Sequence, residues 1–95
     1  MLNLSLPGRV FLCTLPTDMR KSFDSLSGMV EQQLGLDPLS GDLFVFRSKR
    51  GDRLKLLFWD EDGLVLYYKT QMSDCRRLFA RILANAATAD SRILI

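Results

Sequence analysis

The chain has no histidine, only two cysteines and no CxxC pair among its 95 residues. Histidine and paired cysteine are the usual zinc ligands, and dense cysteine spacing marks small disulfide-bonded secreted domains. The sequence therefore indicates neither a zinc site nor a disulfide scaffold. We predict no cofactor, and we expect Cys13 and Cys75 to be free thiols in buried or half-buried positions.

Long apolar runs are also missing. No stretch approaches the roughly 18 apolar residues that a membrane span needs. The first ten residues, MLNLSLPGRV, lack the charged start and the apolar core of a signal peptide. We therefore expect a cytoplasmic location and no membrane partner.

The composition is that of an ordinary globular protein, with 47% hydrophobic and 25% charged residues. A chain of this length builds one modest core. We predict a single domain over residues 1–95.

Apolar spacing divides the first half of the chain into a strand and a helix. Residues 9–15, RVFLCTL, are rich in β-formers and end at Pro16. Helical spacing then begins, with Thr17 or Asp18 as the N-cap and Gly35 as the C-terminal glycine. The predicted buried stripe of this helix is Met19, Phe23, Leu26, Val30 and Leu34.

The period changes after residue 42. The runs LFVFR, RLKLLFWD and LVLYYK are separated by SKRGD and EDG, which have turn chemistry, so they predict an antiparallel meander. Ser73 can cap a last helix that begins around Cys75, and residues 88–95 give no clear signal. The sum is β-α-β-β-β-α, an α+β fold with helices packed on the sheet.

The predicted sheet is apolar on both faces, which leaves two interpretations open. Either each helix covers one face, or one face binds a partner protein or a second copy of the chain. The anchors of such a partner surface would be Leu57, Trp59 and Tyr67.

Basic residues gather around the first turn of the meander and acidic residues at the second. The basic residues are Arg47, Lys49, Arg50, Arg53 and Lys55. Successive turns of a meander lie at opposite ends of a sheet, so the two charged turns should be roughly 20 Å apart. The basic turn can serve solubility alone, or its side chains can bind the phosphates of a nucleic acid.

Neither the carboxylates nor the glycines of the sequence form a known catalytic motif. Asp60, Glu61 and Asp62 are neighbours on a turn, where side chains diverge, and no phosphate-binding glycine motif is present. A small nuclease would need Asp18, Asp24 or Asp60 to converge on a divalent metal. We predict that the protein is not an enzyme.

Residues 17–69 carry a series of motifs in unbroken order. The first motif is a TDMR-x-x-FD block. It is followed by LDP-x-SG-x-LFVF over residues 36–46, by RGDR-x-K-x-L-x-WD-x-DG over residues 50–63, and by a final YK. The first block consists of Thr17, Asp18, Met19, Arg20, Phe23 and Asp24. In these motifs the chain resembles the TnpB-type accessory proteins of the IS-sixty-six family of bacterial insertion sequences.

The resemblance implies a role in DNA transposition beside a large transposase and a second small accessory protein. It supplies no catalytic residues. After Lys69 the family typically continues with RLE-x-GRF-x-W-P, whereas this chain does not, so we divide it into a family-like core at 8–69 and a divergent end at 70–95.

Our hypothesis is a non-catalytic accessory protein that binds element DNA, the transposase or both through the basic turn, with the acidic turn orienting the contact. The alternative is a protein–protein interaction module, a homodimer or a transposase partner, that makes no DNA contact.

Overall fold

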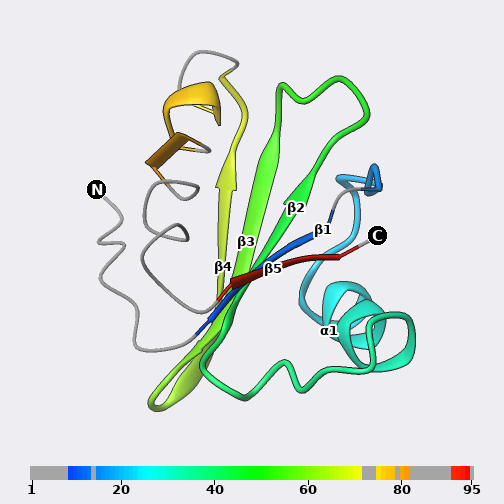
Figure 1. The fold of residues 1–95 in the computed structure, drawn as a ribbon, viewed down its shortest axis with the longest axis vertical. Coiled ribbons are helices and arrows are strands. Elements are labelled where there is room, and N and C mark those ends of the chain that lie inside the picture. The colour runs from blue at the N-terminus through cyan, green and yellow to red at the C-terminus, as the bar shows by residue number, and fades with distance from the viewer. Residues whose placement is uncertain (1–8, 14, 72–74, 79, 82–90, 95) are drawn as a thin grey trace.

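The computed structural model describes residues 9–13, 15–71, 75–78, 80–81 and 91–94. The chain forms an α+β fold, and the predicted order β-α-β-β-β-α is confirmed (Figure 1). A short helix occupies residues 75–78 and 80–81. The other elements are β1 (Val10–Cys13), α1 (Phe23–Gln32), β2 (Leu43–Arg47), β3 (Leu54–Asp60), β4 (Gly63–Lys69) and β5 (Ser91–Leu94).

The sheet has five strands in the order β4-β3-β2-β1-β5. Its β2-β3-β4 part is the predicted antiparallel meander. Strand β1 lies parallel to β2, with Val10 opposite Leu43, and β5 lies parallel to β1 on the other side. Strand β5 comes from the segment to which the sequence assigned no element, because four residues are too short to show a period.

Each helix covers one face of the sheet, as the first of the two sequence interpretations proposed. On the α1 side, the buried residues are Phe11, Cys13, Leu26, Val30, Phe44, Phe46 and Leu57. On the other side, they are Val10, Leu43, Val45, Leu54, Leu56, Cys75 and Leu78. Both faces of the central strands are therefore buried, which explains why these strands are apolar on both sides.

Helix α1 begins later than the sequence predicted. Residues 17–22 form a turn instead, in which the Lys21 N–H donates to the Asp18 carbonyl oxygen and the Arg20 N–H donates to the Asp18 carboxylate. Asp18 therefore caps this turn rather than the helix, and Ser22 occupies the N-cap position. As a consequence Phe23, which was predicted to be buried, is 42% exposed.

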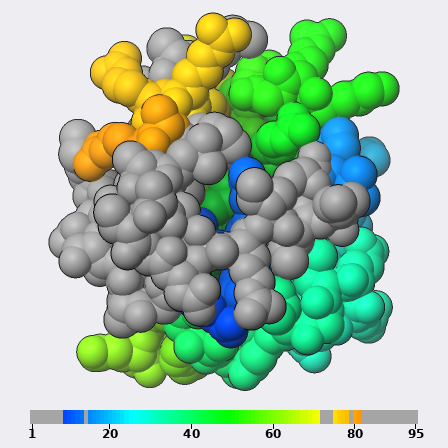
Figure 2. All heavy atoms as spheres, viewed as in Figure 1, coloured from blue at the N-terminus to red at the C-terminus, as the bar shows by residue number. Residues whose placement is uncertain are grey.

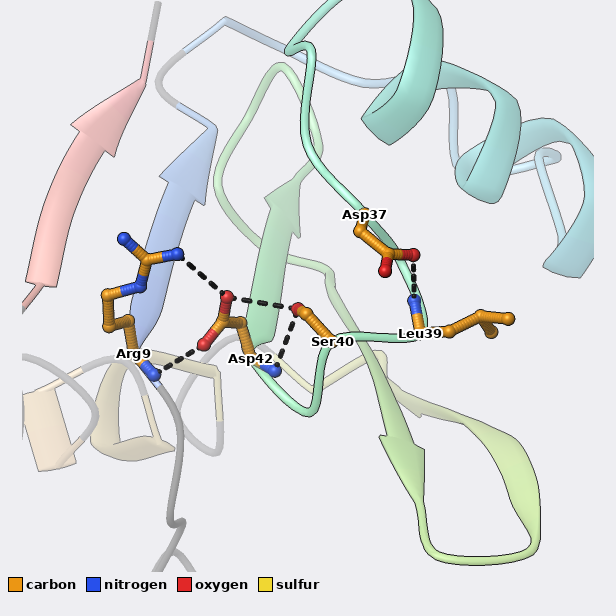
Figure 3. A network of polar contacts seen from close by, with 5 residues as sticks. All are labelled: Arg9, Asp37, Leu39, Ser40 and Asp42. Atoms are coloured by element: carbon orange, nitrogen blue, oxygen red, sulfur yellow. Dashed lines mark hydrogen bonds and ion pairs between the residues drawn. The ribbon is translucent and has the colours of Figure 1, made fainter.

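A polar network joins the starts of β1 and β2 (Figure 3). The buried carboxylate of Asp42 accepts hydrogen bonds from the Arg9 backbone N–H at 2.7 Å and from the Ser40 hydroxyl at 3.0 Å. The Arg9 guanidinium lies 3.4 Å from the same carboxylate, and the Leu43 N–H donates to the Arg9 carbonyl oxygen. These contacts fix the register of the parallel pair.

Candidate functional site

The parallel pairing of β1 and β2 brings two distant segments to one edge of the sheet. The carboxyl ends of two parallel strands lie at the same edge of a sheet, so the segments that follow the strands begin close together. Here the two segments are residues 17–20, which follow β1, and residues 48–53, which follow β2. The Thr17 N–H donates to the Arg47 carbonyl oxygen at 2.9 Å and links them.

An open cavity of about 500 Å³ lies between the two segments. Its lining consists of Thr17, Asp18, Met19, Arg20, Ser48, Lys49, Arg50, Asp52, Arg53 and Tyr68. We call it the basic cavity, because four of these side chains are cationic and two are anionic. In Figure 2 the green atoms that project from the upper part of the molecule belong to the turn between β2 and β3, beside the blue atoms of the segment after β1.

The basic turn is held by its own hydrogen bonds. The Ser48 N–H donates to the Arg53 carbonyl oxygen and the Gly51 N–H to the Ser48 carbonyl oxygen, each at 3.0 Å. The Ser48 hydroxyl donates to the Asp52 carboxylate at 2.9 Å, and the Arg53 N–H donates to that hydroxyl. Gly51 has a φ of 75°, a left-handed conformation that glycine adopts at little cost. The turn therefore presents its side chains from a fixed backbone.

Lys49, Arg50 and Arg53 are exposed on this turn. Among the residues that the structure describes, no carboxylate lies within ion-pair distance of these three cations. Arg47, at the end of β2, is half-buried. Within the described chain, the basic turn therefore carries three cationic side chains that can bind an anion without first breaking an ion pair.

Arg20 and Asp18 form an ion pair at the rim of the cavity. The Arg20 guanidinium contacts both carboxylate oxygens of Asp18, at 2.8 Å through Nη2 and at 3.1 Å through Nε. These side-chain hydrogen bonds, the Arg20 backbone N–H and the arginine charge lower the pKa of Asp18 to about 2. The pair is in solvent, and the carboxylate raises the pKa of Arg20 above its ordinary value.

The structure separates Lys55 from the other predicted phosphate-binding residues. Its side chain is only 6% exposed, and its ammonium donates to the Lys21 carbonyl oxygen and lies 4.7 Å from the centre of the Tyr68 ring. The reason is the strand alternation: Lys55 points to the α1 side of β3, under the segment that leads into the helix. Lys55 belongs to the packing beneath the site.

The three predicted partner anchors do not share a face. Leu57 is fully buried on the α1 side and pairs with Leu66, whereas Tyr67 pairs with Leu56 and packs on the opposite side. Trp59 lies on the same face of β3 as Leu57 and is half-buried. The cross-strand register sets this arrangement, and a surface made of all three residues does not exist.

The family motif residues have different environments. Thr17 is buried, and its hydroxyl has no hydrogen-bond partner within the described part of the chain. Asp18 and Arg20 form the ion pair, and Met19 packs against the core on the α1 side. Phe23 and Asp24 are exposed at the start of α1 and do not line the cavity.

Tyr68 was not among the predicted site residues. It is 43% exposed and lines the basic cavity from the end of β4. Its placement follows from the meander, since the end of β4 lies at the same edge as the turn before β3. The cross-strand pairing of Lys55 with Tyr68 is the signal that could have found it.

No three histidine, cysteine, aspartate or glutamate side chains come together as a metal site within the described ranges. Asp60 begins the turn at the far end of the meander from the basic turn, so it does not converge with Asp18. Among the described residues, the nuclease interpretation therefore finds no set of metal ligands. In the same described ranges, no helix is both long and apolar enough to cross a membrane.

Residues 8–79 match the family described as IS66 Orf2 like protein. The match extends past Lys69, where the motif series ended, into the short helix on the second face.

Two similar proteins come from Sinorhizobium fredii: uncharacterized protein y4jC is 43% identical and uncharacterized protein y4hO is 46% identical, each over 61 residues. Those residues are 64% of this chain but 52% and 53% of the relatives, so the chain spans about half the length of the curated relatives it matches. No solved structure shows a significant match.

Proposed function

The chain belongs to the family of IS66 Orf2-like proteins, and on that premise we propose that it is a non-catalytic accessory protein in the transposition of an insertion sequence. It binds the DNA of the element through the basic cavity. The expected protein partners are the large transposase of the same element and a second small accessory protein.

One observation carries the DNA part of this proposal. Two motif segments of the family line the same cavity, one through residues 17–20 and the other through Arg50, Asp52 and Arg53, although about thirty residues separate them in the sequence. The cavity has exposed cations without ion-pair partners in the described chain, on a turn whose backbone is fixed by Ser48. Phosphates are the anions that such guanidinium and ammonium groups bind on DNA.

Binding of duplex DNA across a salt titration tests the proposal. The affinity of the wild-type protein should fall steeply with salt, since each bound phosphate releases counterions. Replacing Arg50 and Arg53 by glutamine should lower the salt slope by about two, one for each lost phosphate contact. An absence of binding at low salt contradicts the proposal.

A charge-matched pair of variants separates the cavity from the overall charge. Arg50→Glu lowers the net charge by two, and so does the double change Gln32→Glu with Gln33→Glu at the end of α1. Gln32 and Gln33 are exposed and lie outside the cavity lining. We expect loss of binding in Arg50→Glu only, and equal losses in the two variants would mean that binding is not located at the cavity.

A protein contact is the second candidate function. Trp59 and Leu64 pair across β3 and β4, and both are half-buried beside Leu66 on the α1 side. Aromatic side chains of this kind anchor protein interfaces. Trp59→Ala should then abolish binding to the transposase or self-association, while Arg50→Glu leaves that binding intact. Titration calorimetry with purified transposase and sedimentation of the protein alone measure these two outcomes.

A further inference from the structure

Tyr68 is an exposed aromatic side chain inside a cluster of cations. The residue is 43% exposed and lines the basic cavity together with Lys49, Arg50 and Arg53. Phosphate binding alone does not need an aromatic side chain at this place. A charged groove beside an exposed aromatic ring is the combination with which proteins hold unpaired nucleotides.

The Tyr68 ring is oriented before any ligand arrives. The Lys55 ammonium lies 4.7 Å from the ring centre, and the same ammonium donates to the Lys21 carbonyl oxygen. Lys55 is itself 6% exposed, so its position is fixed by packing. A ring that is already ordered loses little conformational entropy when a base stacks on it.

From this geometry we propose that the basic cavity takes an unpaired nucleotide of single-stranded DNA. The base stacks on the face of the Tyr68 ring that the Lys55 ammonium does not cover, and the flanking phosphates bind Lys49, Arg50 and Arg53. This inference rests on the proposed function, since it assumes that DNA binds at the cavity, and it adds the class of DNA. The cavity volume of about 500 Å³ lies within the ordinary range for pockets that hold small ligands.

A single strand and a duplex differ in how easily a base can reach the Tyr68 ring. In a duplex each base is stacked on its neighbours, so a base reaches Tyr68 only after it leaves the stack, which costs free energy. In a single strand the base is available at once. The phosphates are available in both. The cations should therefore contribute to binding of either form, and Tyr68 only to binding of the single strand.

The test uses three fluorescently labelled ligands of one length: a single strand, its duplex, and a sugar–phosphate strand without bases. Tyr68→Leu is the principal variant. Phe23→Leu is the matched control, because Phe23 is 42% exposed and lies outside the cavity. Tyr68→Phe keeps the ring. Thermal unfolding of each variant checks that it is folded.

We expect the wild-type protein to bind the single strand about tenfold more tightly than the strand without bases. Tyr68→Leu should lose this preference and keep its affinity for the duplex, whereas Tyr68→Phe and Phe23→Leu should behave as wild type. Should Tyr68→Leu fail to fold, equal binding of the two single strands by the wild-type protein still overturns the inference.

Two other outcomes separate the inference from its premise. Equal binding of the two single strands by the wild-type protein, with loss of both in Arg50→Glu, overturns the stacking on Tyr68 and leaves the phosphate contact in place. Failure of all three ligands to bind at low salt overturns the proposed DNA function and this inference with it.

Discussion

Lys55 is a charged residue that stabilises the interior of the fold. Its ammonium donates to the Lys21 carbonyl oxygen beneath the basic cavity. We expect Lys55→Met, which keeps the length of the side chain, to lower the free energy of unfolding by about 1–3 kcal/mol, because the carbonyl group loses its donor. Urea denaturation measures the loss.

Lys49, unlike Lys55, is exposed, so we expect it to act in binding and not in stability. Lys49→Met should leave the free energy of unfolding within about 0.5 kcal/mol of wild type, as is usual at the surface, and should weaken DNA binding. Equal effects of the two substitutions on both quantities would contradict the assignment of Lys55 to the interior and Lys49 to the site.

The pKa of the Asp18 carboxyl group can be measured and tests the geometry of the site. Hydrogen bonds from Arg20 hold its pKa at about 2, below the ordinary value of 3.8. Because the folded-state pKa is the lower one, the ion pair contributes to stability above about pH 3.8, and this contribution is lost as the pH falls through about 2. We expect Arg20→Gln to raise the pKa of Asp18 toward 3.8 in a carboxyl-carbon NMR titration.

Lys21→Gln is the control for that experiment. Lys21 acts on Asp18 through its charge alone and is the weakest of the influences on its pKa. The pKa of Asp18 should therefore stay near 2 in this variant. A pKa near 3.8 in the wild-type protein would mean that the Asp18–Arg20 pair does not form in solution.

At the scale of the elements, the sequence predicted the individual strands and the helix, which depend on local residue patterns. Apolar alternation and turn residues identified β2, β3 and β4, and helical spacing identified α1 through Leu26 and Val30, which are buried. The start of α1 was misplaced because Asp18 has the same capping chemistry in a turn as at a helix N-terminus. Periodicity carries no information on which strands pair, so the parallel contact of β1 with β2 was not predicted.

That pairing is also why the candidate site was found only in part. The sequence treated residues 17–20 as a helix start and residues 47–55 as an isolated hairpin. Their meeting depends on contacts such as the one between Thr17 and Arg47. Lys55 was expected to bind phosphates, whereas Tyr68 was assigned no role. Side chains alternate between the two faces of a strand, and the charge of Lys55 gave no sign that this residue is buried.

Asp42 holds the β1–β2 pair at the end opposite the site. Its buried carboxylate accepts from the Arg9 N–H and the Ser40 hydroxyl. We expect Asp42→Ala to lower the free energy of unfolding by about 2–3 kcal/mol, because hydrogen bonds to a buried charge are lost. Asp37→Ala, which removes one exposed hydrogen bond to the Leu39 N–H, should cost less than about 1 kcal/mol in the same urea experiment. Equal costs would contradict a central role of Asp42 in the register.

At the scale of the whole molecule, the edge of the sheet depends on β5. This strand pairs with β1 along four residues, from Val10 opposite Ser91 to Cys13 opposite Leu94. A variant that lacks residues 91–95 exposes the backbone edge of β1, and open edges pair with other chains. We expect this variant to self-associate in size-exclusion chromatography as its concentration rises, while a variant that lacks only residue 95 does not. Identical elution of the two would show that β5 does not protect the edge.

The two charged turns lie at opposite ends of the molecule, which measures 30 × 29 × 25 Å. The net charge of +2 therefore hides a strong separation of charge between these turns, which lie at the top and the bottom of the meander in Figure 1. Such a separation orients an approaching polyanion toward one end and acts mainly on the rate of association.

The hydrogen bond from the Thr17 N–H to the Arg47 carbonyl oxygen joins the two halves of the basic cavity. An amide proton in such a bond exchanges with deuterated solvent only when the bond opens. The Thr17 amide therefore reports how often the two segments part in the free protein. A ligand that contacts both segments will slow its exchange, so one backbone proton can record occupancy of the cavity without any label on the ligand.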